Sequence, residues 1–153
     1  LSNTGNAPVE AIERQHRFVR VLEYSLIPDS GGGGEFRGGL GVRKRFEVLV
    51  DNVLLTTNGD RHQSSPWGLE GGKEGSRTAY IIHRAQGPEV VDAAGMHVLN
   101  SGDVFEMVIS GGGGWGDGAK RAPERVLADI RNGRVSEAAA RALYPHVFLA
   151  EPA

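Results

Sequence analysis

The chain has 153 residues, a formal net charge of −2 and no cysteine. This near-neutral charge argues against a nucleic-acid-binding protein, because binding to phosphates depends on clustered Lys and Arg. The lack of cysteine excludes disulfides, thiolate zinc sites and a cysteine nucleophile. No apolar run approaches the roughly 20 residues that cross a bilayer, and we expect no secretory signal at the start. These features predict a cytoplasmic protein of one domain, although Leu1 in place of Met also fits a piece of a longer polypeptide.

The first part of the chain predicts a short helix followed by strands. Residues 8–14 begin with proline and carry carboxylates in the first turn, which is typical of a helix start. Residues 20–27 alternate apolar and polar side chains, which predicts a half-buried strand. Residues 42–50 and 53–57 predict two more strands. The turn residues at 51–52 between them predict that these two strands pair as a β-hairpin.

The rest of the chain predicts further strands and then two helices. Four β-rich segments separated by turn residues predict short strands at 78–83, 89–91, 96–99 and 104–109. After them, residues 123–131 place Val126, Leu127 and Ile130 on one helical face, and Asn132-Gly133 would end that helix. Ser136 would cap a second helix over 137–143.

These elements together predict an α+β fold: a predominantly antiparallel β body with glycine-rich loops and a short C-terminal helix pair. We expect residues 1–121 to form the β-rich part and residues 122–153 a helical segment of the same domain. The chain contains 23 glycines, and they cluster between the patterned segments, which favours loops over disorder.

A glycine-rich segment around Arg37 is the first candidate site. Gly31 to Gly34, Gly38 and Gly39 surround this arginine, and bare backbone N–H groups beside a guanidinium suit a phosphate or a carboxylate. The alternative is a flexible connection between two strands with Arg37 in a surface ion pair. The segment matches neither the P-loop nor the dinucleotide-binding spacing. On the residues alone, the structural alternative is favoured.

A second candidate site lies in the polar loop over residues 58–76. Asp60 and Arg61 could act as a general base and a charge clamp beside His62, and Trp67 is the aromatic residue of this loop. The alternative is a solvated turn, which the residue types alone favour. The five histidines do not form pairs with metal-ligand spacing, which makes a self-contained metal site improbable. Loops of this length in a compact domain tend to be functional or disordered, and we favour a functional loop.

The last candidate is a second glycine cluster that follows the strand predicted at 104–109. Gly112, Gly113 and Gly114 could point N–H groups at a ligand, or they could form a tight crossover where only glycine fits. Neither interpretation is preferred. The chain alone carries no recognisable catalytic machinery, because it also lacks a nucleophile-elbow serine.

Taken in order, these motifs resemble the C-terminal part of the hydantoinase B/oxoprolinase family. The resemblance covers nearly the whole chain, and it is specific only because the motifs occur together. The residues that carry it are 4–10, 28–41, 60–61, 66–72, 102–103, 111–117, 121, 123–124, 126, 129, 133–136 and 142–144.

This resemblance implies a subunit of an ATP-using enzyme of several chains, in which a hydantoinase A-type partner with a kinase-like fold binds ATP. Family members include N-methylhydantoinases and oxoprolinases, in which ATP drives the opening of a cyclic amide. They also include ketone carboxylases, in which ATP activates the ketone and bicarbonate. The family implies no cofactor on this chain alone, with ATP and a divalent metal expected on the partner subunits.

Two departures from the family pattern refine that expectation. The motifs usually stand at the end of a much longer chain whose N-terminal part holds the metal-site histidines and acids, so we expect the metal and most of the chemistry on another chain. Gly118 also stands where the family commonly has proline. A separately encoded chain of this kind resembles the small subunit of acetophenone carboxylase, which favours a ketone carboxylase completed by larger hydantoinase A-type and hydantoinase B-type subunits.

The sequence therefore leaves three interpretations of the function of this chain. The first is the small subunit of an ATP-dependent ketone carboxylase. The second is a fragment or subunit of an ATP-dependent N-methylhydantoinase or 5-oxoprolinase. The third is a non-catalytic assembly subunit. The site residues expected to hold an anion or to order loops at a subunit junction are Arg37, Gly38, Gly39, Asp60, Arg61, Trp67, Gly112, Gly113 and Gly114; no catalytic residue and no metal ligand is expected.

Overall fold

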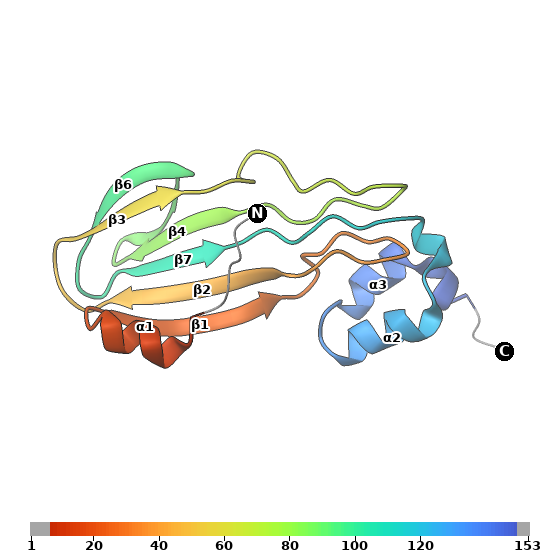
Figure 1. The fold of residues 1–153 in the computed structure, drawn as a ribbon, viewed down its shortest axis with the longest axis horizontal. Helices are drawn as coiled ribbons and strands as arrows, with labels where there is room; N and C mark the ends of the chain where they lie inside the picture. The colour runs from red at the N-terminus through yellow and green to blue at the C-terminus, as the bar shows by residue number, and fades with distance from the viewer. Residues whose placement is uncertain (1–6, 150–153) are drawn as a thin grey trace. The chain divides into compact units, whose positions relative to one another are not determined.

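The computed structural model describes residues 7–149 and divides the chain into two compact units. Unit 1 comprises residues 1–24, 44–59 and 80–107, and unit 2 comprises residues 25–43, 60–79 and 108–153. Figure 1 shows the helices and strands, which are α1 (Val9–Gln15), β1 (Val19–Ile27), β2 (Gly41–Val48), β3 (Val53–Asn58), β4 (Ala79–Arg84), β5 (Gly87–Val91), β6 (Ala94–Leu99), β7 (Val104–Val108), α2 (Pro123–Arg131) and α3 (Glu137–Leu143).

The strands form a five-stranded sheet with the order β1-β2-β7-β4-β5 and a separate two-stranded sheet, β3-β6. β4 and β5 pair antiparallel from Tyr80↔Val91 to Arg84↔Gly87. β3 and β6 pair antiparallel along their whole length, from Val53↔Leu99 to Asn58↔Ala94. The predicted α+β fold with a β-rich body and a C-terminal helix pair is therefore confirmed.

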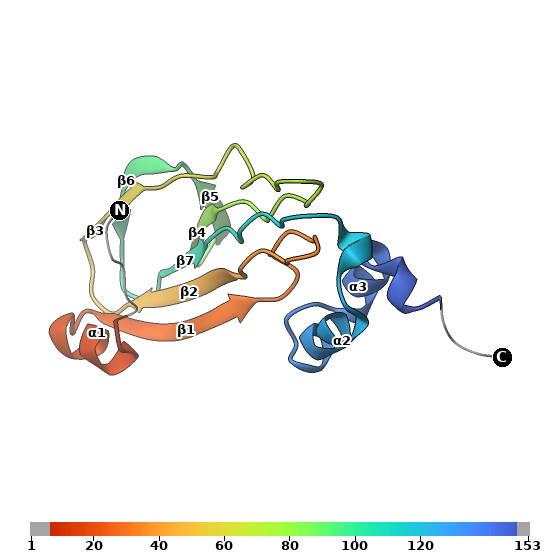
Figure 2. The same cartoon turned by 45° about the vertical axis from the view of Figure 1, so that its right-hand side comes forward.

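The predicted hairpin between β2 and β3 is wrong, although both strands exist where the sequence placed them. β2 has β1 and β7 as its sheet neighbours, so both of its edges are occupied, and β3 pairs with β6 instead. At the end of β2, the N–H of Val48 donates to the carbonyl of Asp103, and that of Gly102 donates to the carbonyl of Val48. The turn at 49–52 therefore carries the chain to a second sheet (Figure 2).

Side chains from both sheets fill the core of unit 1. Ile82 is fully buried and Leu99 is 1% exposed. Tyr80 and Phe105 pack edge to face, with ring centroids 5.7 Å apart. The remaining buried members are Val48 and Val91, with Phe46, Val53, Leu55 and Met107 packed against them. The alternation of β4 and β7 supplies this core, since successive strand residues point to opposite faces.

The two C-terminal helices of unit 2 begin and end at the residues that the sequence predicted. Pro123 is the first residue of α2, and Gly133 after it has a φ of +64°, which favours glycine. The Ser136 hydroxyl caps α3 by accepting from the N–H of Ala139 at 3.1 Å. The predicted apolar face of α2 is wrong at one position, because Leu127 is 42% exposed.

The buried residues of α2 are Val126 and Asp129, so the buried face of this helix does not include Leu127. Val126 packs with Val135, Ala140 and Tyr144 in a small apolar cluster of unit 2. The second buried position belongs to an acidic residue, so the apolar stripe predicted from the sequence is interrupted by an ion-pairing side chain. In the part of the chain that the structure describes, no helix is long and apolar enough to cross a membrane.

Candidate functional site

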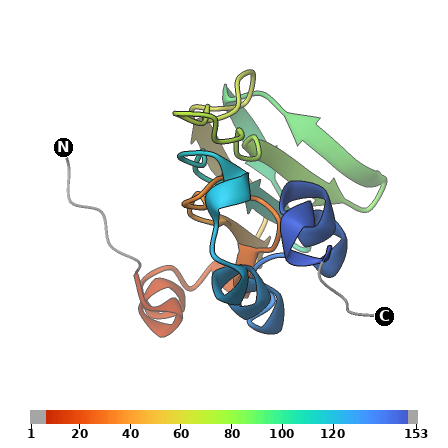
Figure 3. The same ribbon diagram turned by 90° about the vertical axis from the view of Figure 1, so that its right-hand side faces the viewer.

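Three extended segments of unit 2 lie side by side and form what we call the glycine layer: residues 30–41, 66–76 and 110–116 (Figures 1 and 3). The segments are joined by backbone hydrogen bonds rather than by side chains. Gly32 donates to the carbonyl of Gly112 at 2.9 Å, and Gly114 donates to the carbonyl of Lys73 at 2.8 Å. Lys73 in turn donates to the carbonyl of Gly33 at 2.7 Å, so all three segments are connected.

The segments approach so closely that most of these glycines cannot be replaced without moving the backbone. A Cβ at Gly38 would lie 2.0 Å from the carbonyl oxygen of Gly112, and one at Gly113 would lie 1.9 Å from that of Trp67. Gly39 is different, because a Cβ there would meet nothing within 4 Å. The glycines of this region are therefore explained by close backbone packing. The same conflict with backbone atoms occurs at Gly31, Gly32, Gly34, Gly41, Gly68, Gly72, Gly75, Gly111 and Gly114.

The predicted anion loop depended on free N–H groups, and four of the expected donors are used inside the layer. Gly32 donates to the carbonyl of Gly112, Gly38 to that of Gly32, Gly112 to that of Gly39 and Gly114 to that of Lys73. Anion binding here stays a prediction, and it would have to use other donors of the layer. The geometry itself shows a hydrogen-bonded scaffold.

Arg37 extends from the glycine layer to a buried carboxylate on α2. Its Nε donates to Asp129 Oδ2 at 3.0 Å, and its Nη1 donates to the carbonyl of Gly38. Arg121 reaches the same Oδ2 at 2.7 Å, and Arg134 lies 3.6 Å from Oδ1. The side chains of Arg37, Arg121 and Asp129 are only 13%, 8% and 6% exposed. One carboxylate therefore joins arginines from the first glycine segment, from the chain before α2 and from the chain after it.

Burial alone would raise the pKa of Asp129, because it disfavours the charged form. The hydrogen bonds and positive charges of Arg37 and Arg121 outweigh this effect and hold the pKa below its ordinary value. The carboxylate is therefore ionised at neutral pH. A buried charge that is fully paired in this way is costly to disturb, because removing one partner leaves the other uncompensated.

Arg121 connects the helix pair to the glycine layer in two further ways. Its Nη1 donates to the carbonyl of Glu35 at 3.0 Å, and its guanidinium lies 5.6 Å from the ring centroid of Tyr144. The Tyr144 hydroxyl accepts a hydrogen bond from the N–H of Gly34 at 3.3 Å. The sequence identified Arg37 as a site residue and missed Asp129 and Arg121. The available signal was a carboxylate between Val126 and Ile130, on the face predicted to be apolar.

Arg61 and Trp67, which the sequence named separately as site residues, do meet. The Arg61 guanidinium lies 4.9 Å from the Trp67 ring, a cation–π contact. Arg61 has a φ of +65°, which is uncommon for a side chain of this size. Its carbonyl accepts from the N–H of Thr78 at 2.9 Å. Asp60 is exposed. The two predicted arginines therefore have different neighbours: Arg37 contacts a carboxylate and Arg61 contacts an indole.

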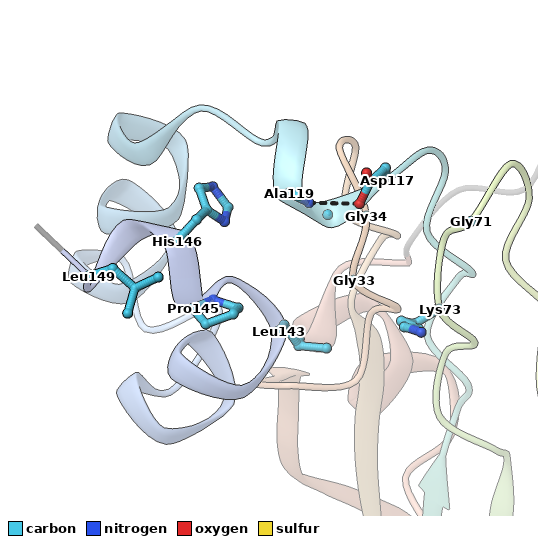
Figure 4. Close-up of a pocket in the computed structure, with 11 residues that line it drawn as sticks. Gly33, Gly34, Gly71, Lys73, Asp117, Ala119, Leu143, Pro145, His146 and Leu149 are labelled. Atoms are coloured by element: carbon cyan, nitrogen blue, oxygen red, sulfur yellow. Dashed lines mark hydrogen bonds between the residues drawn. The ribbon is translucent and has the colours of Figure 1, made fainter.

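A cavity of about 350 Å³ opens between the glycine layer and the segment after α3 (Figure 4). Lys73 and Asp117 stand on one side of it, and His146 and Pro145 stand on the other. Asp117 accepts from the N–H of Ala119 at 2.9 Å, and a ring nitrogen of His146 is 3.0 Å from the carbonyl of Arg121. An ammonium and a carboxylate beside an apolar wall suit a small polar molecule. The sequence did not predict this cavity, because its residues come from four distant stretches of the chain.

Between residues 7 and 149, no three or more His, Asp or Glu side chains gather in a way that could hold a metal ion. The glycine segments also lack the Lys-Ser/Thr ending of a P-loop. These described residues therefore offer no cluster for a divalent metal, which the resemblance assigns to partner subunits together with ATP, and no chemical step through either group is derived for this chain.

Comparison with known proteins adds a family to this geometry. The family model described as hydantoinase B/oxoprolinase matches residues 1–118. Caprolactamase subunit beta of Pseudomonas jessenii is 39% identical over 82% of this chain, and an uncharacterized protein of Methanocaldococcus jannaschii is 34% identical over 86%. Among solved structures, the ATP-dependent caprolactamase of Pseudomonas jessenii has a TM-score of 0.80 at 34% identity, covering 90% of the chain. A nucleotide-free acetone carboxylase has a TM-score of 0.75 at 22% identity over 90% of the chain, which shows the fold alone.

The chain corresponds to only a small part of each of these proteins. It spans 22% of caprolactamase subunit beta and 23% of the Methanocaldococcus jannaschii protein. In the solved structures it covers 24% of the caprolactamase chain and 22% of the acetone carboxylase chain. The matched region is therefore one portion of a much longer polypeptide in each of these relatives.

Proposed function

The chain belongs to the hydantoinase B/oxoprolinase family, and on that premise we propose that it completes a hydantoinase B-type subunit of an ATP-dependent enzyme made of several chains. The observation that carries the proposal is the likeness to the ATP-dependent caprolactamase, at a TM-score of 0.80, over only 24% of that chain. A region that relatives carry inside a longer chain needs the rest of that chain to act. Larger hydantoinase A-type and hydantoinase B-type subunits are the proposed partners, in the cytoplasm.

The proposed contribution of this chain is structural rather than catalytic. Four expected donors of the glycine layer bond to its own carbonyls, and Arg37 is paired with Asp129. A scaffold of this kind holds loops in fixed positions, as a loop held at a subunit junction requires. ATP and a divalent metal are assigned to the partner subunits, together with the catalytic centre.

Two reactions are candidates for the whole enzyme. The resemblance to the small subunit of acetophenone carboxylase favours an ATP-dependent ketone carboxylase, which would join a ketone and bicarbonate into a β-keto acid while ATP is hydrolysed. The 39% identity to caprolactamase subunit beta favours the second candidate, an ATP-dependent opening of a cyclic amide. In both candidates this chain would act with hydantoinase A-type and hydantoinase B-type subunits, and the candidates differ in the substrate and in the reaction that ATP drives.

The experiment that tests the proposal is a native purification of this chain from its own host. Mass spectrometry identifies the chains that accompany it, and ATP hydrolysis is then measured with acetophenone or acetone plus bicarbonate, with caprolactam and with hydantoins. Ketone-dependent hydrolysis supports the carboxylase, whereas hydrolysis that depends on a cyclic amide supports the second candidate. Purification of the chain without any hydantoinase-type partner would overturn the proposal.

A variant of the same preparation separates a structural role from a catalytic one. We expect Arg37→Ala to lower recovery of the complex and its activity together, because Arg37 pairs with the buried Asp129. Arg131→Ala is the matched control, since Arg131 is exposed and is not among the candidate site residues. A complex that assembles fully with Arg37→Ala but no longer hydrolyses ATP would instead assign Arg37 to the active site.

A further inference from the structure

Three large apolar side chains form a row across the glycine layer: Phe36, Trp115 and Leu69. Phe36 and Trp115 exchange both backbone hydrogen bonds at 2.9 Å, as directly opposed residues of antiparallel strands do. Leu69 pairs with Trp115 on the other side: it donates to the carbonyl of Gly114 and accepts from the N–H of Gly116, both at 3.0 Å. Directly paired residues place their side chains on the same face. We call these three residues the apolar row.

The apolar row is exposed although its backbone is fixed. Phe36, Leu69 and Trp115 are 49%, 57% and 46% exposed. The rings of Phe36 and Trp115 contact each other with centroids 5.6 Å apart. Single exposed apolar residues are normal on a protein surface. A contiguous row on a rigid backbone is different, because such rows mark interaction sites.

Charged side chains of both signs lie beside the row. The guanidinium of Arg125 is 5.8 Å from the centroid of the Phe36 ring. A shallow hollow of about 250 Å³ next to Phe36 is lined by Glu35, Lys120, Glu124 and Arg125, among others. An apolar centre with aromatic anchors and a mixed-charge rim is the composition of a protein–protein interface. A nucleic acid or an anionic membrane would instead need a rim of one sign.

We propose that the apolar row is the surface on which the larger hydantoinase B-type chain docks. The occupant follows from length, because this region makes up only 22–24% of the related chains. In those relatives, the rest of the polypeptide is more than three times as long as the matched region, and it is available to pack against a surface of that region. The proposal rests on the function proposed above, and it adds the place of contact.

The closing experiment uses thiol labelling of the complex, since the chain contains no cysteine of its own. Leu69→Cys introduces a single thiol in the row, and Val50→Cys introduces one at a matched position in unit 1, which is 47% exposed. Each tagged variant is labelled with a maleimide, alone and in complex with the hydantoinase B-type chain identified by mass spectrometry. We expect labelling at Leu69→Cys to slow at least about tenfold in the complex, and labelling at Val50→Cys to keep its rate.

A charge variant gives a second measurement that does not depend on labelling. Leu69→Asp should retain at least about tenfold less of the hydantoinase B-type chain than the wild type, while Val50→Asp retains as much. Equal labelling of Leu69→Cys with and without the partner, or full retention by Leu69→Asp, would overturn the docking surface and leave the proposed function intact. If the wild-type chain retains no hydantoinase-type partner, the proposed function fails and the docking surface fails with it.

Discussion

Each of the two units of this chain is stabilised internally by a different kind of packing. Unit 1 has an ordinary apolar core, in which Ile82 and Leu99 are buried between strands and Tyr80 packs on Phe105. The glycine layer of unit 2 has almost no side chains between its segments. Its backbones approach until a Cβ at Gly38 would stand 2.0 Å from a carbonyl oxygen, and N–H groups bond directly to carbonyls across the gap.

This difference decides which substitutions each unit tolerates. Burial of side-chain carbon stabilises unit 1 at roughly 25 cal/mol per Å², so removing carbon from it is costly. Between the segments of the glycine layer there is almost no side-chain carbon to remove. Adding a single methyl group is the costly change there. Backbone N–H groups of the layer also donate to carbonyls of the same layer, which makes it a rigid support for side chains such as Phe36 and Trp115.

The largest effect is expected from Gly38→Ala. The new Cβ would overlap the carbonyl of Gly112, so the two segments must separate and their hydrogen bonds must lengthen. We expect a loss of about 4 kcal/mol or more in the free energy of unfolding. Urea denaturation followed by circular dichroism measures it.

Gly39→Ala is the matched control for this substitution, one residue along the chain. A Cβ at Gly39 meets nothing within 4 Å, and its φ is not among the positive ones. We expect a change below about 1 kcal/mol, with stabilisation the favoured sign because alanine restricts the unfolded chain. Equal losses at Gly38 and Gly39 would show that close packing is not what the glycines serve.

The next effect comes from unit 1, where Ile82→Ala removes carbon from the centre of the core. Ile82 is fully buried, so we expect a loss of about 3 kcal/mol in the free energy of unfolding from lost burial and a residual cavity. Ile81→Ala on the opposite face of β4 should cost only about 1 kcal/mol, because Ile81 is half-buried. Similar losses at both positions would contradict the core assigned here.

The same contrast explains which parts of the fold the sequence could predict. Side-chain periodicity correctly placed β1, β2, β4 and the helix pair, although the face of β1 that carries Leu22 and Leu26 is exposed, at 45% and 60%. It could not predict that β3 pairs with β6, since strand partners depend on which edges are already occupied. The hairpin predicted from Asp51-Asn52 failed for that reason: β7 and β1 already flank β2.

For the candidate site, the sequence predicted which residue types are present but not which of them contact one another. The sequence indicated that glycines around Arg37 permit a close approach, but not what they approach, because partners such as Gly112 for Gly38 lie in distant segments of the chain. Arg61 and Trp67, which the sequence named separately as site residues, contact each other in the structure, and their function as a site stays a prediction. The sequence missed Asp129, because a carboxylate in a helix is ordinarily a solvated residue, and only the convergence of Arg37 and Arg121 makes it a buried ion-pair centre.

A smaller loss of stability is expected at Asp129, the carboxylate that pairs Arg37 of the layer with Arg121. Asp129→Asn should cost about 2 kcal/mol of unfolding free energy at pH 7, because it weakens charged hydrogen bonds to Arg37 and Arg121. Asp92→Asn, at an exposed position, is the control and should change little.

The pH dependence of this loss follows from the lowered pKa of Asp129. A carboxyl group whose pKa is lower in the folded state contributes stability above its unfolded pKa of about 3.9. That contribution is lost as the pH falls through the folded pKa. The difference between wild type and Asp129→Asn should therefore be constant near pH 7 and shrink below about pH 4. A difference that stays constant down to pH 2 would mean that the carboxylate charge does not stabilise the fold.

The smallest effect is expected at Arg61, where a side-chain contact and an unfavourable backbone conformation oppose each other. Arg61→Ala removes the cation–π contact with Trp67 and keeps the φ of +65°, so it should cost about 0.5–1 kcal/mol. Arg61→Gly also removes the contact but relieves the left-handed backbone, which should recover about 1 kcal/mol relative to alanine. Urea denaturation of the two variants compares these terms directly. If Arg61→Gly is no more stable than Arg61→Ala, the backbone at this position is unstrained, and the lost contact with Trp67 alone accounts for the destabilisation.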